Sequence, residues 1–255
     1  MVELKTTAEL DAMREAGRVV GVILDAVQRV ADVDVSLREL DEVGRTVLSE
    51  AGAASPFLNY RPHFAATPFP AVMCTSVNDA IVHGIPDDYR LRDGDVVGVD
   101  CGATLDGWAG DAAVTFIVGT PRPADTRLID TTRQALQAGI AAAVVGARIG
   151  DISHAIGSIA RAAGYGIMED FGGHGIGRHM HEDPGVPNEG RPGRGLRLRH
   201  GMTLAIEPML IAGGRDKYRT APDGWTLLTT DGTRAAHIEH TIAVTDDGPR
   251  ILTLP

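Results

Sequence analysis

Two aspartates on a predicted β-hairpin have the spacing of metal ligands. Asp106-Gly107, a dipeptide that favours a two-residue hairpin turn, separates two apolar runs. With this pair as the loop, Asp111 lies opposite Gly102, two residues from Asp100 on the other strand. Because side chains alternate along a strand, both carboxylates point from one face, roughly 7–8 Å apart at the backbone. The sequence therefore predicts a pair of acids on one face of a Val-rich hairpin.

This pair of carboxylates on an apolar hairpin creates an electrostatic problem. An ionised carboxylate is costly to bury, and two of them repel each other, so one takes up a proton unless a cation lies between them. A divalent metal ion at Asp100 and Asp111 would remove this cost. The alternative is a hydrated face on which both acids contact water, and further ligands have to decide between the two interpretations.

A histidine framed by glycines is the third candidate. His174 stands in the Gly-rich stretch 171–184, where it has little side-chain packing, so a ligand role is favoured over a loop histidine in water. The glycines do not fit the dinucleotide-binding fingerprint, because its third glycine would fall at Arg178. His181 is a further candidate, either as a ligand or as a hydrogen-bond donor in catalysis, whereas His179 is the expected bystander.

Two glutamates each interrupt an apolar, strand-like segment. They are Glu207 in Ala-Ile-Glu-Pro-Met and Glu239 in His-Ile-Glu-His-Thr, and either one alone could equally point to solvent from the outer face of a sheet. Together with His174 and the two aspartates they make a set of one imidazole and four carboxylates. Such a set suits two divalent ions, of Mn, Fe, Co or Zn, better than a thiolate zinc site. Paired ions of this kind generate hydroxide at neutral pH and polarise a carbonyl group.

The elements that must position these residues follow the same order twice along the chain. Apolar residues at three- and four-residue steps predict helices, with a Ser36/Glu39 capping box and Asp151 as an N-cap marking two of their starts. The repeated order helix, helix, strands predicts an α+β fold with an internal duplication, and a site at the seam between the two halves. The predicted helices are 7–31, 36–52, 128–144 and 151–164, and the predicted strands are 72–77, 80–86, the hairpin strands on either side of 106–107, 203–206, 225–229 and 237–244. The chain is then one catalytic domain, 1–255, with halves at approximately 7–120 and 124–255.

Two proline-containing segments are predicted as loops. Residues 55–72 hold three of the five phenylalanines of the chain and could line a pocket. Residues 183–201 combine proline and glycine with four arginines and are predicted to be exposed. These arginines could touch ribosomal RNA, but a solvated loop is the favoured interpretation.

The composition is that of an ordinary globular protein. Hydrophobic residues make up 44% and charged residues 23% of the 255 residues, which argues against disorder. No window approaches the roughly 18 apolar residues of a membrane span. The N-terminus lacks the regions of a signal peptide, and Cys74 and Cys101 form no CxxC pair, so a reducing, cytoplasmic location is expected. A net charge of −10 argues against a nucleic-acid binder and favours cations.

The motifs around these residues resemble those of the type I methionine aminopeptidases, in order and spacing and over nearly the whole chain. They are His83-Gly84-Ile85-Pro86, Val99-Asp100-Cys101-Gly102, Gly110-Asp111, Gly173-His174-Gly175-Ile176-Gly177, His181, Ile206-Glu207-Pro208-Met209, Asp223-Gly224-Trp225 and Glu239-His240-Thr241. The resemblance implies the pita-bread fold and a site for two divalent metal ions. The implied metal ligands are Asp100, Asp111, His174, Glu207 and Glu239, with Asp111 and Glu239 bridging the ions.

The resemblance also implies an activity and roles for the neighbouring side chains. A bridging hydroxide would attack the first peptide carbonyl and remove the initiator methionine from nascent proteins that have a small second residue. Glu207 would double as proton shuttle, His181 would stabilise the developing oxyanion, and His83 would orient the substrate or assist proton transfer. The positions that match the apolar pocket for methionine are Tyr60, Cys74, Met180 and Trp225.

The partners that follow from this resemblance are the N-termini of nascent polypeptides. A ribosome contact is left open, no DNA or membrane partner is expected, and the chain is expected to act as a monomer. The family usually has a short Tyr-His-Gly-Tyr-Pro-like segment before the strand that holds Cys74, where this chain has the longer 60–70 segment. This departure leaves the tolerance for the second substrate residue open.

Three alternatives compete with this interpretation. A binding protein on the same fold that has lost catalysis predicts missing ligands, whereas all five are present. A proline-directed peptidase of the same superfamily usually carries an additional N-terminal domain, for which residues 1–50 are too short. A thiol hydrolase built on Cys101 and His174 is disfavoured, because the charge of Asp100 would raise the pKa of the thiol.

Overall fold

The structure is a computed structural model that describes residues 2–62 and 65–255. Within these residues the order helix, helix, strands occurs twice, as the sequence pattern predicts. The helices are α1 (Thr7–Val30), α2 (Leu37–Ala51), α3 (Pro123–Ala142) and α4 (Ile149–Ala162). The strands are β1 (Met73–Val77), β2 (Ala80–Val82), β3 (Val96–Leu105), β4 (Trp108–Ile117), β5 (Gly166–Ile167), β6 (Gly172–Gly175), β7 (Glu182–Pro187), β8 (Thr203–Ile206), β9 (Met209–Ile211), β10 (Tyr218–Thr220), β11 (Leu227–Thr229), β12 (Ala235–His237), β13 (Glu239–Thr245) and β14 (Gly248–Ile251).

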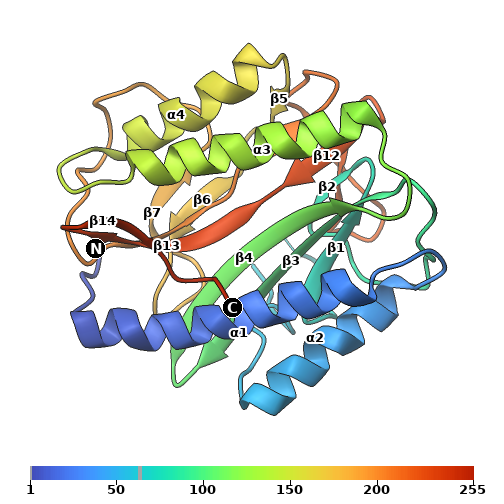
Figure 1. Ribbon diagram of the computed structural model, residues 1–255, viewed down its shortest axis with the longest axis horizontal. Helices are drawn as coiled ribbons and strands as arrows, with labels where there is room; N and C mark the ends of the chain where they lie inside the picture. The colour runs from blue at the N-terminus through green and yellow to red at the C-terminus, as the bar shows by residue number, and fades with distance from the viewer. Residues whose placement is uncertain (1, 63–64) are drawn as a thin grey trace.

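One curved sheet joins the two sets of strands. Its order is β1-β3-β4-β13-β8-β6-β7, with β14 paired to β13, and two smaller sheets have the orders β10-β11-β2 and β12-β9-β5. The pair of helices α1 and α2 runs along one side of the strands and the pair α3 and α4 along the other (Figure 1). The antiparallel β4–β13 pair connects the strands of the first set to those of the second, so the seam predicted from the sequence lies inside a continuous sheet.

The central hairpin has the register that its sequence predicts. Asp100 pairs with Ala113, and Gly102 pairs with Asp111, along a ladder that is continuous from one end of the hairpin to the other. Its turn needs positive φ at both loop residues, and Asp106 and Gly107 have φ of 49° and 77°. The hairpin prediction is therefore confirmed residue by residue.

The first three predicted helices are confirmed in place, but α3 begins at Pro123, five residues before its predicted start at 128. Ser36 and Glu39 form the predicted capping box of α2, and Gly52 ends that helix at φ 64°. The N-cap prediction for α4 is wrong, because the helix begins at Ile149 and Asp151 lies in its first turn. The Asp151 carboxylate instead accepts the backbone N–H of Arg148 at 2.7 Å. An aspartate therefore marks this helix start from its third helical position.

The strand predictions need three corrections. Residues 183–201 are not all loop, because β7 occupies the start of this segment and pairs with β6. The predicted strand 237–244 is interrupted at Ile238, which separates β12 from β13. The predicted strand 80–86 ends at Val82. The short strands β5, β6, β9, β10 and β14 were not predicted, because segments of two to four residues give too few alternations to show a period.

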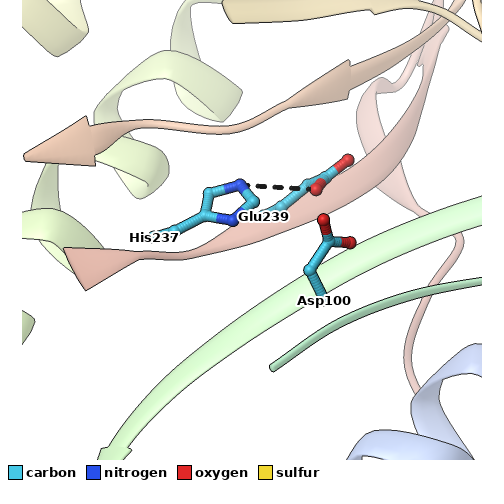
Figure 2. Close-up of side chains that lie close together, drawn as sticks. All are labelled: Asp100, His237 and Glu239. Carbon is cyan, nitrogen blue, oxygen red and sulfur yellow. Dashed lines mark ion pairs between the residues drawn. The ribbon is translucent and has the colours of Figure 1, made fainter. Parts of the chain in front are cut away.

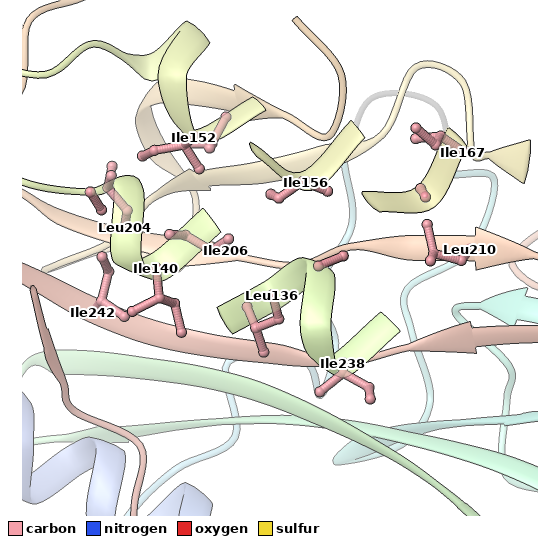
Figure 3. Packing of buried hydrophobic residues seen from close by; sticks show 14 of the residues in the cluster. Leu136, Ile140, Ile152, Ile156, Ile167, Leu204, Ile206, Leu210, Ile238 and Ile242 are labelled. Carbon is pink, nitrogen blue, oxygen red and sulfur yellow. The ribbon is translucent and has the colours of Figure 1, made fainter. Parts of the chain in front are cut away.

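A large apolar core lies beneath helices α3 and α4. Leu136 and Ile152 from the helices pack with Ile206 and Ile238 from the sheet side (Figure 3). Fully burying each such side chain contributes roughly 1.5–3 kcal/mol. Because Ile206 and Ile238 are held in this core, the chain is fixed immediately before Glu207 and Glu239. A second core, with Val20, Leu40 and Val97 among its members, fixes β1 and β3 against α1 and α2 in the same way.

Across the described ranges 2–62 and 65–255, no helix has the length and apolar character needed to cross a membrane.

Asp41→Ala should destabilise the fold by about 2–4 kcal/mol, because it leaves buried backbone donors without an acceptor. The Asp41 carboxylate on α2 is 5% exposed and accepts the N–H groups of Val72 at 2.9 Å and Met73 at 3.2 Å, both through Oδ1. These bonds hold the start of β1 against the helix. Urea unfolding measures the loss. Asp41→Asn is the matched control, since its Oδ1 can still accept both bonds, and an equal loss in both variants would contradict this account.

Candidate active site

One cavity collects every residue that the sequence analysis assigns to a site. Its volume is about 300 Å³, which is typical of small-ligand sites. Its lining includes the predicted metal ligands Asp100, Asp111, His174, Glu207 and Glu239, the predicted catalytic residues His83 and His181, and the predicted pocket residues Tyr60, Cys74, Met180 and Trp225. The structure therefore brings all of these side chains together, and their individual roles remain predictions.

Neighbouring strands of the main sheet deliver the acids and the imidazole. In sheet order they are Asp100 on β3, Asp111 on β4, Glu239 at the start of β13, Glu207 directly after β8, and His174 on β6. Because these five strands are consecutive in the sheet, residues that are far apart in the sequence reach one cavity. The site thus lies across the β4–β13 seam.

Several polar atoms of this cluster are buried and have no hydrogen-bond partner within the described part of the chain. They are Asp100 Oδ1, Asp111 Oδ1, Glu239 Oε1 and His237 Nε2. Candidate ligand atoms also fall into two sets, Asp100 with His237 and Glu239, and Asp111 with His174 and Glu239, each within 4.8 Å of one another. Figure 2 shows the first set, with its three side chains converging between β3 and β13. Buried donors and acceptors without partners are expensive, and two divalent cations would supply the missing interactions.

The pKa values of the acids show the same need for positive charge. Burial raises the pKa of Asp100 to about 7, with Glu207 adding to the shift and His237 opposing it. Burial together with Asp100 and Glu207 raises the pKa of Asp111 well above its ordinary value. Burial together with the neighbouring acids likewise raises the pKa of Glu239 well above its ordinary value. Three carboxylates therefore resist ionisation near neutral pH unless a cation compensates them.

His174 is held in the tautomer that a metal ligand needs. Its Nδ1 lies 2.9 Å from the carbonyl oxygen of Gly175, so Nδ1–H donates there and Nε2 keeps a free lone pair. Nε2 faces the acids, 3.9 Å from Asp111 Oδ2 and 3.7 Å from Glu207 Oε1. The glycines around it allow close strand packing, because a Cβ on Gly173 would meet the carbonyl oxygen of Ala205 at 2.2 Å. His174 is thus a buried strand residue and not a loop residue in water.

The sequence analysis missed His237. This residue ends β12, is 4% exposed, and places Nε2 3.5 Å from Glu207 Oε2 and 3.5 Å from Glu239 Oε2. The sequence pattern indicated an ordinary residue of an apolar strand beside Glu239. Residues two apart on a strand share a face, so a strand through both residues would point His237 and Glu239 to the same side. That spacing is the signal that could have found it.

His181 and Tyr60 meet at the mouth of the cavity. The Tyr60 hydroxyl lies 3.2 Å from His181 Nδ1, and the His181 ring centroid lies 4.3 Å from that of His174. Partial burial, together with His174, lowers the pKa of His181, so the ring is neutral at physiological pH. A neutral imidazole that accepts a hydrogen bond at Nδ1 carries its proton on Nε2 and can donate it. His179, the expected bystander, is exposed and outside the cavity lining.

The loop that carries His181 is tied to the N-terminal segment. Lys5, which is 4% exposed, places Nζ 3.0 Å from Glu182 Oε2, and Glu182 Oε1 accepts the backbone N–H of His179 at 3.0 Å. These contacts lower the pKa of Glu182 against the opposing effect of burial. The ion pair therefore fixes the backbone on both sides of Met180 and His181.

Aromatic side chains form the apolar wall of the cavity. Phe69 packs edge-on against Trp225 at 5.1 Å and against Phe57 at 6.5 Å, and Trp225 Nε1 donates to the carbonyl of Thr67 at 3.1 Å. The 55–72 segment thus lines a pocket as expected. His63 and Phe64 of that segment lie outside the described residues. The sequence analysis did not assign Phe57, Phe69 and Phe171, which also line the cavity.

His83 lines the cavity beside Trp225 and Phe171. Its backbone has φ 60°, and its ring packs against Phe171 at 5.6 Å and Trp225 at 6.4 Å. Burial lowers its pKa to about 4, so this imidazole is also neutral. A neutral imidazole held in a strained backbone conformation at the cavity wall is suited to orienting a bound group.

A thiol nucleophile is excluded by the environment of Cys101. The residue is fully buried, and burial together with Asp100 and Asp111 raises the pKa of its thiol well above the ordinary value. The thiol therefore stays protonated and unreactive at neutral pH.

Comparisons with known proteins show the family to which the chain belongs. The model of metallopeptidase family M24 matches residues 11–246. Methionine aminopeptidase 1 of Mycobacterium tuberculosis (strain CDC 1551 / Oshkosh) is 52% identical to the chain, over 100% of this chain and 96% of the relative. The crystal structure of methionine aminopeptidase from Thermotoga maritima has a TM-score of 0.95 and 39% identity, covering 100% of both chains.

A more distant similarity concerns the fold alone. The prolidase from Pyrococcus horikoshii OT3 has a TM-score of 0.76 and 21% identity, and the match covers 98% of this chain but 63% of the prolidase. Together with the aminopeptidase structure, this similarity confirms the predicted α+β pita-bread fold.

Proposed function

The chain belongs to metallopeptidase family M24, and from this membership we propose that its cavity holds two divalent metal ions with which it removes methionine from the N-termini of nascent polypeptides. Relatives that are methionine aminopeptidases match it over its full length, which makes it an enzyme of this kind. The observation that carries the proposal for the metal site is the group of buried carboxylate atoms without hydrogen-bond partners in the described residues, on Asp100, Asp111 and Glu239, which line one cavity.

Five residues would hold the two ions. They are Asp100, Asp111, His174, Glu207 and Glu239, with Asp111 and Glu239 shared between the ions. Glu239 belongs to both sets of neighbouring ligand atoms, which supports its shared role. The donors are mostly hard oxygen with imidazole, as Mn, Fe, Co and Zn accept. Ions bound here would lower the pKa of water and polarise a carbonyl group.

Three side chains would act on the substrate directly. Burial alone would raise the pKa of Glu207, but His237, His174 and His181 outweigh it and lower that pKa. The Glu207 carboxylate is therefore ionised, as a group must be that takes up a proton when the peptide bond is attacked and returns it to the departing amine nitrogen. His181 would donate Nε2–H to the oxygen that gains negative charge, and His83 would orient the peptide from the opposite wall.

The apolar wall would select the substrate. The methionine side chain would enter between Tyr60, Cys74, Met180 and Trp225, where Phe57 and Phe69 complete the enclosure. Tyr60 also contacts His181 at the cavity mouth, so a large second residue of the peptide would collide with this pair. We infer that the substrates have a small second residue.

The domain organisation and the cellular location of the enzyme are two further parts of the proposal. We infer one catalytic domain with halves near 7–120 and 124–255, because cores such as the one that joins Leu10 and Met13 to Ile176 and Ala243 cross the boundary between them. A cytoplasmic setting fits the two cysteines of the described residues, Cys74 and Cys101, which are both free thiols.

Release of free methionine from Met-Ala-Ser and Met-Leu-Ser peptides tests the proposal. The protein is first stripped of metal and then titrated with Mn, Co, Fe and Zn salts. We expect no release without metal, release from the Ala peptide with at least one metal, and at least about 100-fold slower release from the Leu peptide, as for rejection of extra bulk from a closed pocket.

The two peptides separate the parts of the proposal. Release from neither peptide by folded, metal-loaded protein would contradict the aminopeptidase activity at this site. Equal release from both would leave the metal chemistry intact and contradict the small-residue selection that Tyr60 and His181 are proposed to impose.

A further inference from the structure

His237 is a buried imidazole at the centre of the acid cluster that the five proposed ligands leave without a role. Its side chain is 4% exposed, and its Nε2 has no hydrogen-bond partner among the described residues. A buried polar nitrogen without a partner costs free energy, so its position needs a cause. Figure 2 shows the ring at the end of β12, directed toward Glu239 and facing the side of the site where Asp100 lies.

The backbone of His237 is fixed from a neighbouring strand. The Thr115 hydroxyl on β4 donates to the His237 carbonyl oxygen at 2.6 Å and accepts the His237 N–H at 3.0 Å. The following residue, Ile238, is anchored in the core beneath α3. The fold itself therefore fixes the backbone position from which the imidazole reaches the cluster.

The distances around Nε2 are those between two ligands of one ion. Nε2 lies 3.5 Å from Glu207 Oε2 and 3.5 Å from Glu239 Oε2. A side-chain hydrogen bond would bring these atoms to about 2.7–3.2 Å. Two ligands that each lie about 2.0–2.2 Å from a shared ion, at tetrahedral or octahedral angles, are instead separated by about 3.0–3.5 Å. The proposed ligand His174 lies slightly farther from its acids, at 3.7 and 3.9 Å, so the separations of His237 fit a shared ion at least as well.

We propose that His237 is a sixth metal ligand, which binds the ion at Asp100 and Glu239 through Nε2. This inference rests on the proposed two-ion centre and deepens it. Each ion then has one imidazole of its own, because His237 groups with Asp100 and His174 groups with Asp111, and Glu239 belongs to both groups. A neutral imidazole at this position makes the ligand set one charge less negative than a carboxylate there would.

The tautomer of His237 in the zinc-loaded protein tests the assignment. A ligand that binds through Nε2 carries its proton on Nδ1, whereas a histidine that donates a hydrogen bond to Glu207 or Glu239 carries it on Nε2. Nitrogen NMR of protein labelled with 15N-histidine reports both the protonated nitrogen and the metal-bound one. We expect two histidines with metal-bound Nε2 in the wild type, and only one, His174, in His237→Gln.

A matched control is available one residue beyond Glu239. His240 lies on the other face of β13, where its Nδ1 lies 2.8 Å from Thr253 Oγ1. His240→Gln should keep both metal-bound signals. Calorimetric titration with Zn²⁺ should show His237→Gln losing affinity for one of the two ions by at least the roughly 10- to 100-fold that loss of an outer hydrogen-bond partner costs, while His240→Gln keeps both affinities.

The outcomes separate this inference from the function on which it rests. Two bound ions with a single metal-bound imidazole, or His237 with its proton on Nε2, would overturn the sixth-ligand assignment and leave the two-ion centre standing. Failure of folded wild-type protein to bind zinc would overturn the centre itself. The wild-type spectrum decides the tautomer, so the test holds even where His237→Gln does not fold.

Discussion

Glu239→Gln is expected to remove metal binding and peptidase activity together, lowering kcat/KM by more than about 10³-fold, beyond the loss of a single transition-state hydrogen bond. Glu239 belongs to both sets of neighbouring ligand atoms, so its loss affects both proposed ions. An amide is a neutral and weaker ligand than a carboxylate. Elemental analysis of the purified variant and methionine release from Met-Ala-Ser measure the two losses on one sample.

The same substitution should leave the metal-free fold as stable as the wild type or more so. Glu239 is 2% exposed, and burial together with Asp111, Glu207 and Asp100 raises its pKa well above the ordinary value. Removing one acid from this cluster relieves that cost. Thermal unfolding with and without metal should therefore show a loss of metal-induced stabilisation only. Glu50→Gln, at an exposed position of α2, is the control. Retained metal and activity in Glu239→Gln would refute the shared-ligand assignment.

Prediction from the sequence succeeded where the local residues also determine how larger elements pair. The Asp106-Gly107 turn fixes the hairpin register, and that register alone places Asp100 and Asp111 side by side. The helices with clear apolar periodicity were likewise found. The elements that were not predicted depend on contacts between distant segments of the chain. Strand β6 is Gly-rich and has no alternation of its own, and it exists because β7 and β8 pair with it on both sides.

The missing site residues have the same explanation. His237 looks like an ordinary member of an apolar run until the sheet brings Glu207 from β8 beside it. Phe57 and Phe69 lie in a segment without regular structure, whose path over the cavity depends on contacts with Trp225 more than 150 residues later. A pattern in one segment cannot report such a partner. The metal site was predictable because the free-energy cost of burying several carboxylates follows from the residues themselves. The apolar wall of the cavity forms only when distant segments of the chain pack together.

His181→Ala is expected to lower kcat by about 10²- to 10³-fold while the metal content stays unchanged, as for loss of one donor to a developing oxyanion. Its ring lies beside His174, and Tyr60 lies 3.2 Å from its Nδ1; in the tautomer in which Nδ1 accepts from the Tyr60 hydroxyl, Nε2–H is the donor toward the cavity. Because this bond forms with the charge of the transition state, KM should change far less than kcat.

The control for this variant is His179→Ala, on the same loop. His179 is exposed, and it helps to fix the loop through its backbone, whose N–H donates to Glu182 and whose carbonyl oxygen accepts from Gly177, so the substitution should leave kcat and metal content unchanged. Loss of metal in His181→Ala would make His181 a ligand in place of a donor. An equal fall of kcat in both variants would mean that the loop, held by Lys5 and Glu182, was disturbed as a whole. A loss confined to kcat in His181→Ala is the one result that assigns the donor to this imidazole, because no other described histidine at the mouth of the cavity contacts both Tyr60 and His174.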